Sequence, residues 1–221
     1  MNKFLFSLSA LFVACATFSV AQAQEVKGDA KAGEKKIAMC IGCHGIAGYQ
    51  ASFPEIHKVP KISGQGAKYI VSALTAYKKG ERKHPTMRGV ADNLSDQDMA
   101  DLGAYYEGHG KVEGFVLPAK AADGSARATE LVKKGACVSC HGENFSMPTV
   151  PSYPKIAGQY SDYLYVALKA YKTEGNPQVG RANAVMGGVV KQFSNAELKE
   201  LAAYVGGLPG ELKTVSQGKF R

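Results

Sequence analysis

The chain has 221 residues and a formal net charge of +8, a length that suits one large domain or two small ones. Its 27 basic residues are scattered and form no long block, so the composition does not indicate a nucleic-acid-binding protein. A mild positive excess suits an acidic protein partner or an anionic membrane surface instead.

The first 23 residues predict a secretory signal peptide. Lys3 gives a positive start, residues 4–20 are almost wholly apolar or small, and Ala21-Gln22-Ala23 forms a small-x-small cleavage site. We therefore expect export to the periplasm and removal of residues 1–23. That leaves 198 residues with a charge of +7, because Lys3 is lost. The apolar run is short for a membrane span, although retention as an uncleaved anchor stays open.

The mature sequence is an internal repeat, with the same marks in the same order in each half. A Cys-x-x-Cys-His-Gly string is followed by Pro-Lys-Ile-x-Gly-Gln, a Tyr…Ala-Leu…Ala-Tyr-Lys run, a methionine and a Ser-x-x-acid box. The first half has these marks at Cys40–Gly45, Pro60–Gln65, Tyr69–Lys78, Met87 and Ser95–Asp98, and the second at Cys137–Gly142, Pro154–Gln159, Tyr163–Lys172, Met186 and Ser194–Glu197. The repeat predicts two tandem domains, 24–112 and 113–221.

Apolar periodicity predicts that both domains are all-α. A first helix is expected over Asp29–Cys40, with Ile37 and Cys40 on one face. A longer helix is expected over Gln65–Lys79 and again in the second half, because apolar residues recur there at spacings of three and four. The sequence shows no convincing strand of period two.

The end of each half predicts a loop and then a capped helix. Met87 and Met186 are expected in glycine-containing loops. Ser95 and Ser194 are expected N-caps, each with an acid three residues later that completes a capping box. The segment Gly108–Ser125, with its glycine, proline and small residues, is the expected linker, and the tail after residue 206 is expected to pack poorly.

The repeated Cys-x-x-Cys-His string predicts two covalently attached haem c groups. Two cysteines of each string reach the porphyrin vinyl groups, and the next histidine ligates the iron. The cysteines are Cys40 and Cys43, then Cys137 and Cys140, and the histidines are His44 and His141.

Three other readings of the cysteines are weaker. A zinc site would join pairs 93 residues apart in separate repeats, whereas structural zinc sites favour short loops. A thioredoxin-like pair needs a βαβ pattern, which the sequence lacks. Disulfides would leave His44 and His141 unexplained.

The repeat also selects candidates for the second iron ligand. Met87 and Met186 each precede the serine of the capping box by eight residues, and a thioether ligand raises the reduction potential. His84 is the competitor, since it lies three residues before Met87 but has no repeated histidine counterpart. Pro60 and Pro154 open a repeated motif, and their carbonyls either accept from the ligating imidazoles or belong to turns that the prolines merely rigidify.

With these residues the chain resembles the di-haem class I cytochromes c, most of all the cytochrome c4 family. The resemblance covers nearly the whole mature chain and implies two cytochrome c folds facing each other, each wrapped around one haem c with His/Met ligation. It further implies that Pro60 and Pro154 accept the hydrogen bonds of the haem histidines. Family members carry a glycine seven residues before the first cysteine, packed against an aromatic residue of the last helix. Gly33 matches, whereas Glu130 departs from this pattern in the second half.

The expected function is electron transfer rather than catalysis, because two strong axial ligands leave the iron no open position for a substrate. The resemblance implies a periplasmic carrier between respiratory-chain donors and a terminal oxidase or other acceptor. One alternative is the electron-accepting subunit of a periplasmic dehydrogenase or sulfide-oxidising flavoprotein, and another is a di-haem redox enzyme. The expected partners are redox proteins, namely a donor complex and a terminal oxidase or reductase. We expect a monomer that binds no nucleic acid, with peripheral membrane association left open.

Overall fold

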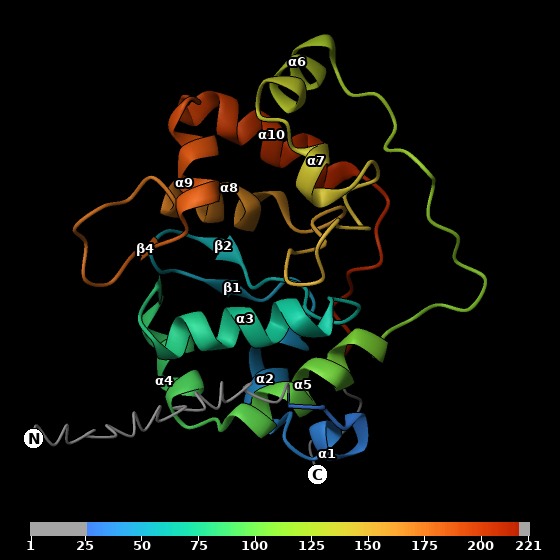
Figure 1. The fold of residues 1–221 in the computed structure, drawn as a ribbon, viewed down its shortest axis with the longest axis vertical. Helices are drawn as coiled ribbons and strands as arrows, with labels where there is room; N and C mark the ends of the chain where they lie inside the picture. Colours follow the sequence, from blue (N-terminus) through green and yellow to red (C-terminus); the bar gives the residue numbers. More distant parts are fainter. Residues whose placement is uncertain (1–25, 217–221) are drawn as a thin grey trace, which may run out of the picture.

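The computed structural model describes residues 26–216, so the predicted signal peptide lies outside the described residues. Five helices of the first half are α1 (Ala30–Glu34), α2 (Ala38–His44), α3 (Ala67–Lys78), α4 (Pro85–Asp92) and α5 (Asp96–Gly108). Their counterparts in the second half are α6 (Ala126–Lys134), α7 (Val138–His141), α8 (Ser161–Ala170), α9 (Ala184–Lys191) and α10 (Asn195–Gly207). The two sets form two helical bodies stacked along the long axis of the molecule (Figure 1), in agreement with the repeat.

The predicted first helix is interrupted, which corrects the expectation of one helix over Asp29–Cys40. The chain turns at residues 35–37 between α1 and α2. Before the turn, α1 lies against α5. After it, α2 carries Cys40 toward the interior. Because α1 and α2 make different tertiary contacts, their axes differ in direction and the helix is interrupted between them. Apolar periodicity in the sequence does not predict such an interruption.

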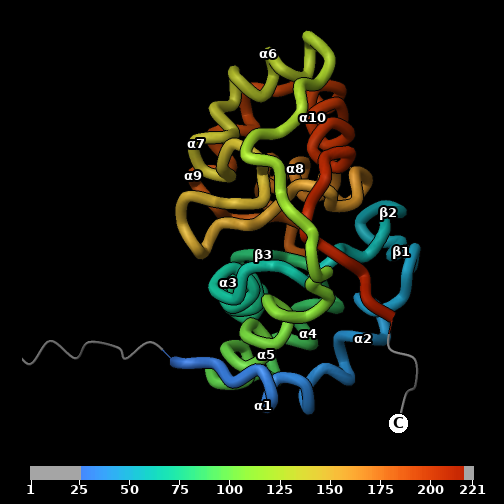
Figure 2. The backbone as a smooth tube through the Cα atoms, turned by 90° about the vertical axis from the view of Figure 1, so that its right-hand side faces the viewer, coloured from blue at the N-terminus to red at the C-terminus, as the bar shows by residue number. Residues whose placement is uncertain are grey.

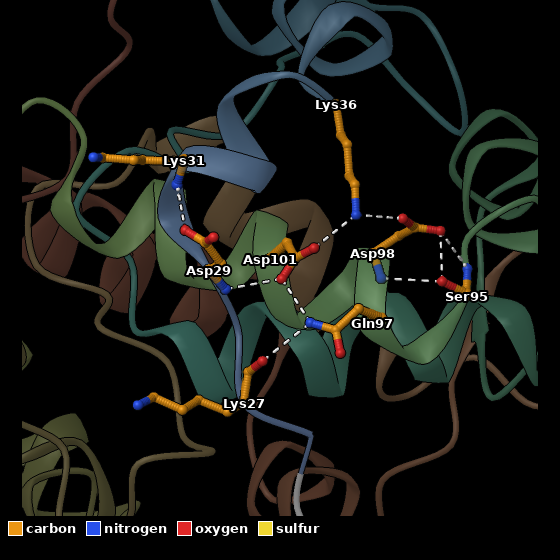
Figure 3. Close-up of polar contacts among 8 residues, drawn as sticks. All are labelled: Lys27, Asp29, Lys31, Lys36, Ser95, Gln97, Asp98 and Asp101. Atoms are coloured by element: carbon orange, nitrogen blue, oxygen red, sulfur yellow. Dashed lines mark hydrogen bonds and ion pairs between the residues drawn. The ribbon is translucent and has the colours of Figure 1, made fainter.

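A polar network fixes α1 on α5 (Figure 3). The buried carboxylate of Asp101 accepts from the Asp29 backbone N–H at 2.8 Å and from Lys36 Nζ at 2.6 Å. Lys36 also pairs with Asp98 at 2.6 Å, and Asp98 closes the capping box with Ser95. The hydrogen bond from Lys36 holds the pKa of Asp101 below its ordinary value.

The close approach of α1 and α5 requires a glycine in the first domain. A Cβ at Gly33 would lie 2.1 Å from the Asp101 carbonyl oxygen and 2.9 Å from the Cβ of Tyr105. In the second domain Glu130 is exposed, and α6 instead buries Ala128 and Leu131 and pairs Arg127 with Glu197. The two domains therefore pack the same helix in different ways.

Helix packing forms the cores in both domains. α3 packs on α5 and α8 packs on α10. The first core centres on Ile37, Leu102 and Tyr106, and the second on two adjoining clusters that include Leu131, Phe145, Leu164, Leu198 and Val205. Both predicted capping boxes are present, at the start of α5 and of α10.

Two short antiparallel ladders accompany the helices. β1 (Gln50–Ala51) pairs with β2 (His57–Lys58) within the first domain. β3 (Arg82–Lys83) pairs with β4 (Gly180–Arg181) across the two domains. Each strand has only two residues, too few for a period-two pattern to appear in the sequence.

The linker and the tail both run between the domains (Figure 2). The described part of the tail is ordered against the first domain, which corrects the expectation of poor packing. Leu212 is 2% exposed, and the Lys213 N–H donates to the Ser63 carbonyl at 2.9 Å. Among residues 26–216, no helix combines the length and the apolar character that a membrane span needs.

Candidate functional site

A cavity of about 900 Å³ lies between the domains, and the predicted site residues of both domains line it. Its walls include the cysteines and histidines of both Cys-x-x-Cys-His strings and both predicted methionines: Cys40, Cys43, His44, Met87, Cys137, Cys140, His141 and Met186. Many of the other lining residues are apolar, among them Ile70, Leu74, Leu102, Leu168, Val190 and Leu201. The structure thus gathers every candidate ligand around one apolar space.

Within residues 26–216, no disulfide joins any two of Cys40, Cys43, Cys137 and Cys140. Within the described part of the chain, no cluster of three or more His, Cys, Asp or Glu side chains is arranged to hold a metal ion. Neither the disulfide alternative nor the zinc alternative therefore has a structural counterpart.

Each histidine of the two motifs is held by one proline carbonyl. His44 Nδ1 donates to the Pro60 carbonyl at 2.8 Å, and His141 Nδ1 donates to the Pro154 carbonyl at 3.1 Å. Burial lowers the pKa of both imidazoles, which favours the neutral ring. With Nδ1 occupied, Nε2 is the nitrogen that remains for a ligand bond.

The methionines stand on short helices, not in the loops that the sequence suggested. α4 and α9 begin with the N-caps His84 and Asn183, whose side chains accept from the backbone N–H of Met87 and Met186. These caps are a histidine and an asparagine, not the serine of a Ser-x-x-acid box. The sequence therefore showed no capping box here, and the prediction of loops was wrong for both segments. His84 is the counterpart of Asn183 in the repeat, and its Nδ1 caps α4 as Asn183 caps α9. We therefore assign His84 a structural role as a helix cap.

Two arginines in the cavity wall were missed by the sequence analysis. Arg82 donates to the Tyr69 hydroxyl at 3.2 Å and to the Tyr163 hydroxyl of the other domain at 2.7 Å. Arg181 donates to the same Tyr163 hydroxyl at 3.1 Å. Each arginine lies five residues before its methionine, so aligning the two halves would have found both.

The charges of these arginines test whether the cavity suits haem. Within the described residues, no carboxylate forms an ion pair with either guanidinium, and Arg82 Nε is buried without a hydrogen-bond partner. Burial alone would raise the pKa of Tyr163, but the two guanidiniums outweigh it and lower that pKa to about 8. Buried cations require an anionic partner. A planar apolar group that carries carboxylates, as haem does, fits both the lining and this charge.

Comparison with known proteins gives consistent matches over both halves. Residues 30–108 and 125–209 match the family model described as cytochrome c. The chain is 32% identical over 224 residues to cytochrome c4 of Stutzerimonas stutzeri, covering 94% of this chain and all of that protein. It is also 30% identical to the thiosulfate dehydrogenase electron acceptor of Stutzerimonas stutzeri strain A1501, covering 83% of this chain and 87% of that one.

Solved structures give the same result. The crystal structure of reduced recombinant cytochrome c4 from Pseudomonas stutzeri aligns with a TM-score of 0.59 at 30% identity, covering 82% of this chain and all of the other. The sequence and structure comparisons thus agree over the greater part of the described residues.

Proposed function

Since the chain belongs to the cytochrome c family and carries two covalently attached haem c groups, we propose that it shuttles electrons in the periplasm between respiratory-chain donors and a terminal oxidase or other acceptor. One observation carries this proposal: both candidate ligand sets line a single cavity between the domains. An electron that arrives at one site therefore has a second site of the same chain beside it.

We propose the following roles for the residues of each site. Cys40 and Cys43 would attach the first haem through thioether bonds, and His44 and Met87 would ligate its iron. In the second site Cys137 and Cys140 would form the thioether bonds, and His141 and Met186 would ligate the iron. When bound, the iron supplies a one-electron couple whose potential the axial ligands and burial tune.

The side chains around each site support transfer rather than catalysis. The carbonyls of Pro60 and Pro154 hold the neutral imidazoles in one orientation, which limits rearrangement when the charge changes. Met87 and Met186 lie on capped helices that fix the backbone of each methionine. Two protein ligands would leave the iron no open position for a substrate. We accordingly assign the chain no catalytic residue.

Carbon monoxide separates a carrier from a di-haem enzyme, because the gas binds reduced iron only where an axial position is open. We expect the reduced protein to show no spectral change under carbon monoxide, and to be reoxidised completely by membranes that contain a terminal oxidase. Ready carbon monoxide binding at one site would refute the carrier role and favour an enzyme.

A second candidate function is that of an electron-accepting partner of a periplasmic dehydrogenase. The likeness to a thiosulfate dehydrogenase electron acceptor supports this candidate. Mixing the oxidised protein with thiosulfate dehydrogenase and thiosulfate tests it directly: rapid reduction of both sites favours the second candidate. Reduction that is no faster than without the enzyme rules out this particular donor.

The proposal also covers the removal of the leader and the limits of the two domains. We propose cleavage after Ala23 and domains that span residues 24–112 and 113–221 of a monomer. Intact-mass analysis of the exported protein would give the first residue, since a retained leader adds the mass of residues 1–23. Size-exclusion chromatography with light scattering would give the oligomeric state.

A further inference from the structure

The last residue of the repeated Pro-Lys-Ile-x-Gly-Gln motif joins the two domains. Gln65 and Gln159 are 4% and 5% exposed. Gln65 Nε2 donates to the Lys155 carbonyl at 2.9 Å, and the Lys155 N–H donates to Gln65 Oε1 at 3.0 Å. In the mirror arrangement Gln159 Nε2 donates to the Lys61 carbonyl at 2.9 Å, and the Lys61 N–H donates to Gln159 Oε1 at 2.9 Å. Each carboxamide thus uses both its donor and its acceptor on the opposite domain.

The orientation of each carboxamide is fixed by a further bond from its own domain. The Gly66 N–H donates to Gln65 Oε1 at 2.9 Å, and the Tyr160 N–H donates to Gln159 Oε1 at 3.1 Å. Each oxygen therefore accepts from two backbone N–H groups, one from each domain. A flipped amide would place its NH₂ against these donors, so the assignment of oxygen and nitrogen is determined.

The peptide group that each glutamine contacts is the one that holds a haem histidine. The Lys61 N–H and the Pro60 carbonyl belong to a single peptide unit. Its N–H donates to Gln159 Oε1, while its carbonyl accepts from His44 Nδ1. The Lys155 N–H and the Pro154 carbonyl likewise connect Gln65 to His141. A hydrogen-bonded chain thus runs from each glutamine, through one peptide, to the imidazole of the other domain.

Hydrogen bonds in such a chain strengthen one another. An acceptor on the peptide N–H makes the carbonyl of that peptide a better acceptor. A stronger bond to Nδ1–H gives the imidazole more anionic character, which makes Nε2 a better donor to iron. A better donor favours the ferric state and lowers the reduction potential.

We propose that Gln65 and Gln159 are positioning residues that act crosswise: Gln159 tunes the haem of His44, and Gln65 tunes the haem of His141. The inference rests on the proposed function, in which these histidines ligate iron. It adds that the potential of each site is partly set by the opposite domain, so that loosening the contact between the domains changes both potentials.

Potentiometric titration of the full-length holoprotein, with the two haems resolved by NMR, tests the proposal. Gln159→Met keeps the length of the side chain and removes the acceptor. We expect it to raise the potential of the His44 haem while the His141 haem stays near its wild-type value. The Nδ1–H of His44 should also exchange faster with solvent. Gln65→Met should instead raise the potential of the His141 haem and leave the His44 haem near its wild-type value.

Two further variants control for structure. In Gln159→Glu a carboxyl oxygen still accepts from the Lys61 N–H, so the potential of the His44 haem should not rise. If Gln159→Met fails to fold, a rise in the potential of the His44 haem in Gln159→Glu would still contradict the proposal. Tyr160→Phe removes a hydroxyl contact to Thr214 at 3.1 Å beside the same junction and should leave both potentials unchanged.

Three outcomes would overturn the crosswise assignment. They are a shift of the His141 haem in Gln159→Met, an equal shift of both haems, or no shift at all. Failure of the proposed function has a different signature, because the wild-type protein itself would then lack two His/Met haem spectra.

Discussion

The contact between α1 and α5 gives a prediction whose size follows from the structure. In Gly33→Ala the new Cβ would meet the Asp101 carbonyl oxygen at 2.1 Å and the Tyr105 Cβ at 2.9 Å. Ordinary contacts are longer than 3.4 Å, and the nearest atom belongs to the backbone of α5, so the helices must separate by more than an ångström. Overpacking of this kind costs about 1–3 kcal/mol. We expect a value near 3 kcal/mol, because the separation also strains the bond from the Asp29 N–H to Asp101.

Urea unfolding followed by far-UV circular dichroism measures this cost. The midpoint of the transition that unfolds the first domain should fall by the lost free energy divided by the unfolding slope. Gly108→Ala is the matched control on α5, since a Cβ there meets nothing within 4 Å. A Gly33→Ala protein as stable as the wild type would refute the tight packing of α1 on α5.

Three more predictions concern ligands and charge. Replacing Met87 or Met186 with leucine should lower one reduction potential, leave the other nearly intact and let the reduced variant bind carbon monoxide; equal shifts of both potentials would contradict the ligand assignment. Arg82→Gln removes a cation that bonds to tyrosines of both domains, so both potentials should fall, as measured by potentiometry; an unchanged pair would mean that this charge is not felt at the iron. The hydrogen bond from Lys36 lowers the pKa of Asp101 from its ordinary 3.8, so the stabilisation is complete above that pH and is lost as the pH falls through the lowered value. Asp101→Asn should therefore shift the urea midpoint more at pH 7 than at about pH 2, and a shift of equal size at both would contradict the ion pair.

The repeat made most of the architecture predictable. The Cys-x-x-Cys-His strings and the methionines are marked by sequence alone, and the structure brings them to one cavity. Capping boxes at Ser95 and Ser194 were predictable because their chemistry is local. The helical segment Gln65–Lys79 was found to within two residues, as its apolar face repeats over several turns.

The errors have tertiary causes. The break between α1 and α2 depends on Gly33 and Lys36 meeting α5, which no local pattern reports. The order of the tail depends on the burial of Leu212 in the folded chain. Arg82 and Arg181 were detectable in principle by their equal spacing from the methionines. Their pairing in β3 and β4 required the structure, because the partners come from different domains.

Haem quantification and a ferric absorption spectrum of the purified protein would show whether it carries two His/Met-ligated haem groups. We predict that the purified, exported protein contains two covalently bound haem c groups per chain, and that its ferric spectrum shows the far-red charge-transfer band of His/Met ligation at both sites. A colourless protein from cells with a working haem-attachment apparatus, or one with a single haem per chain, would contradict it.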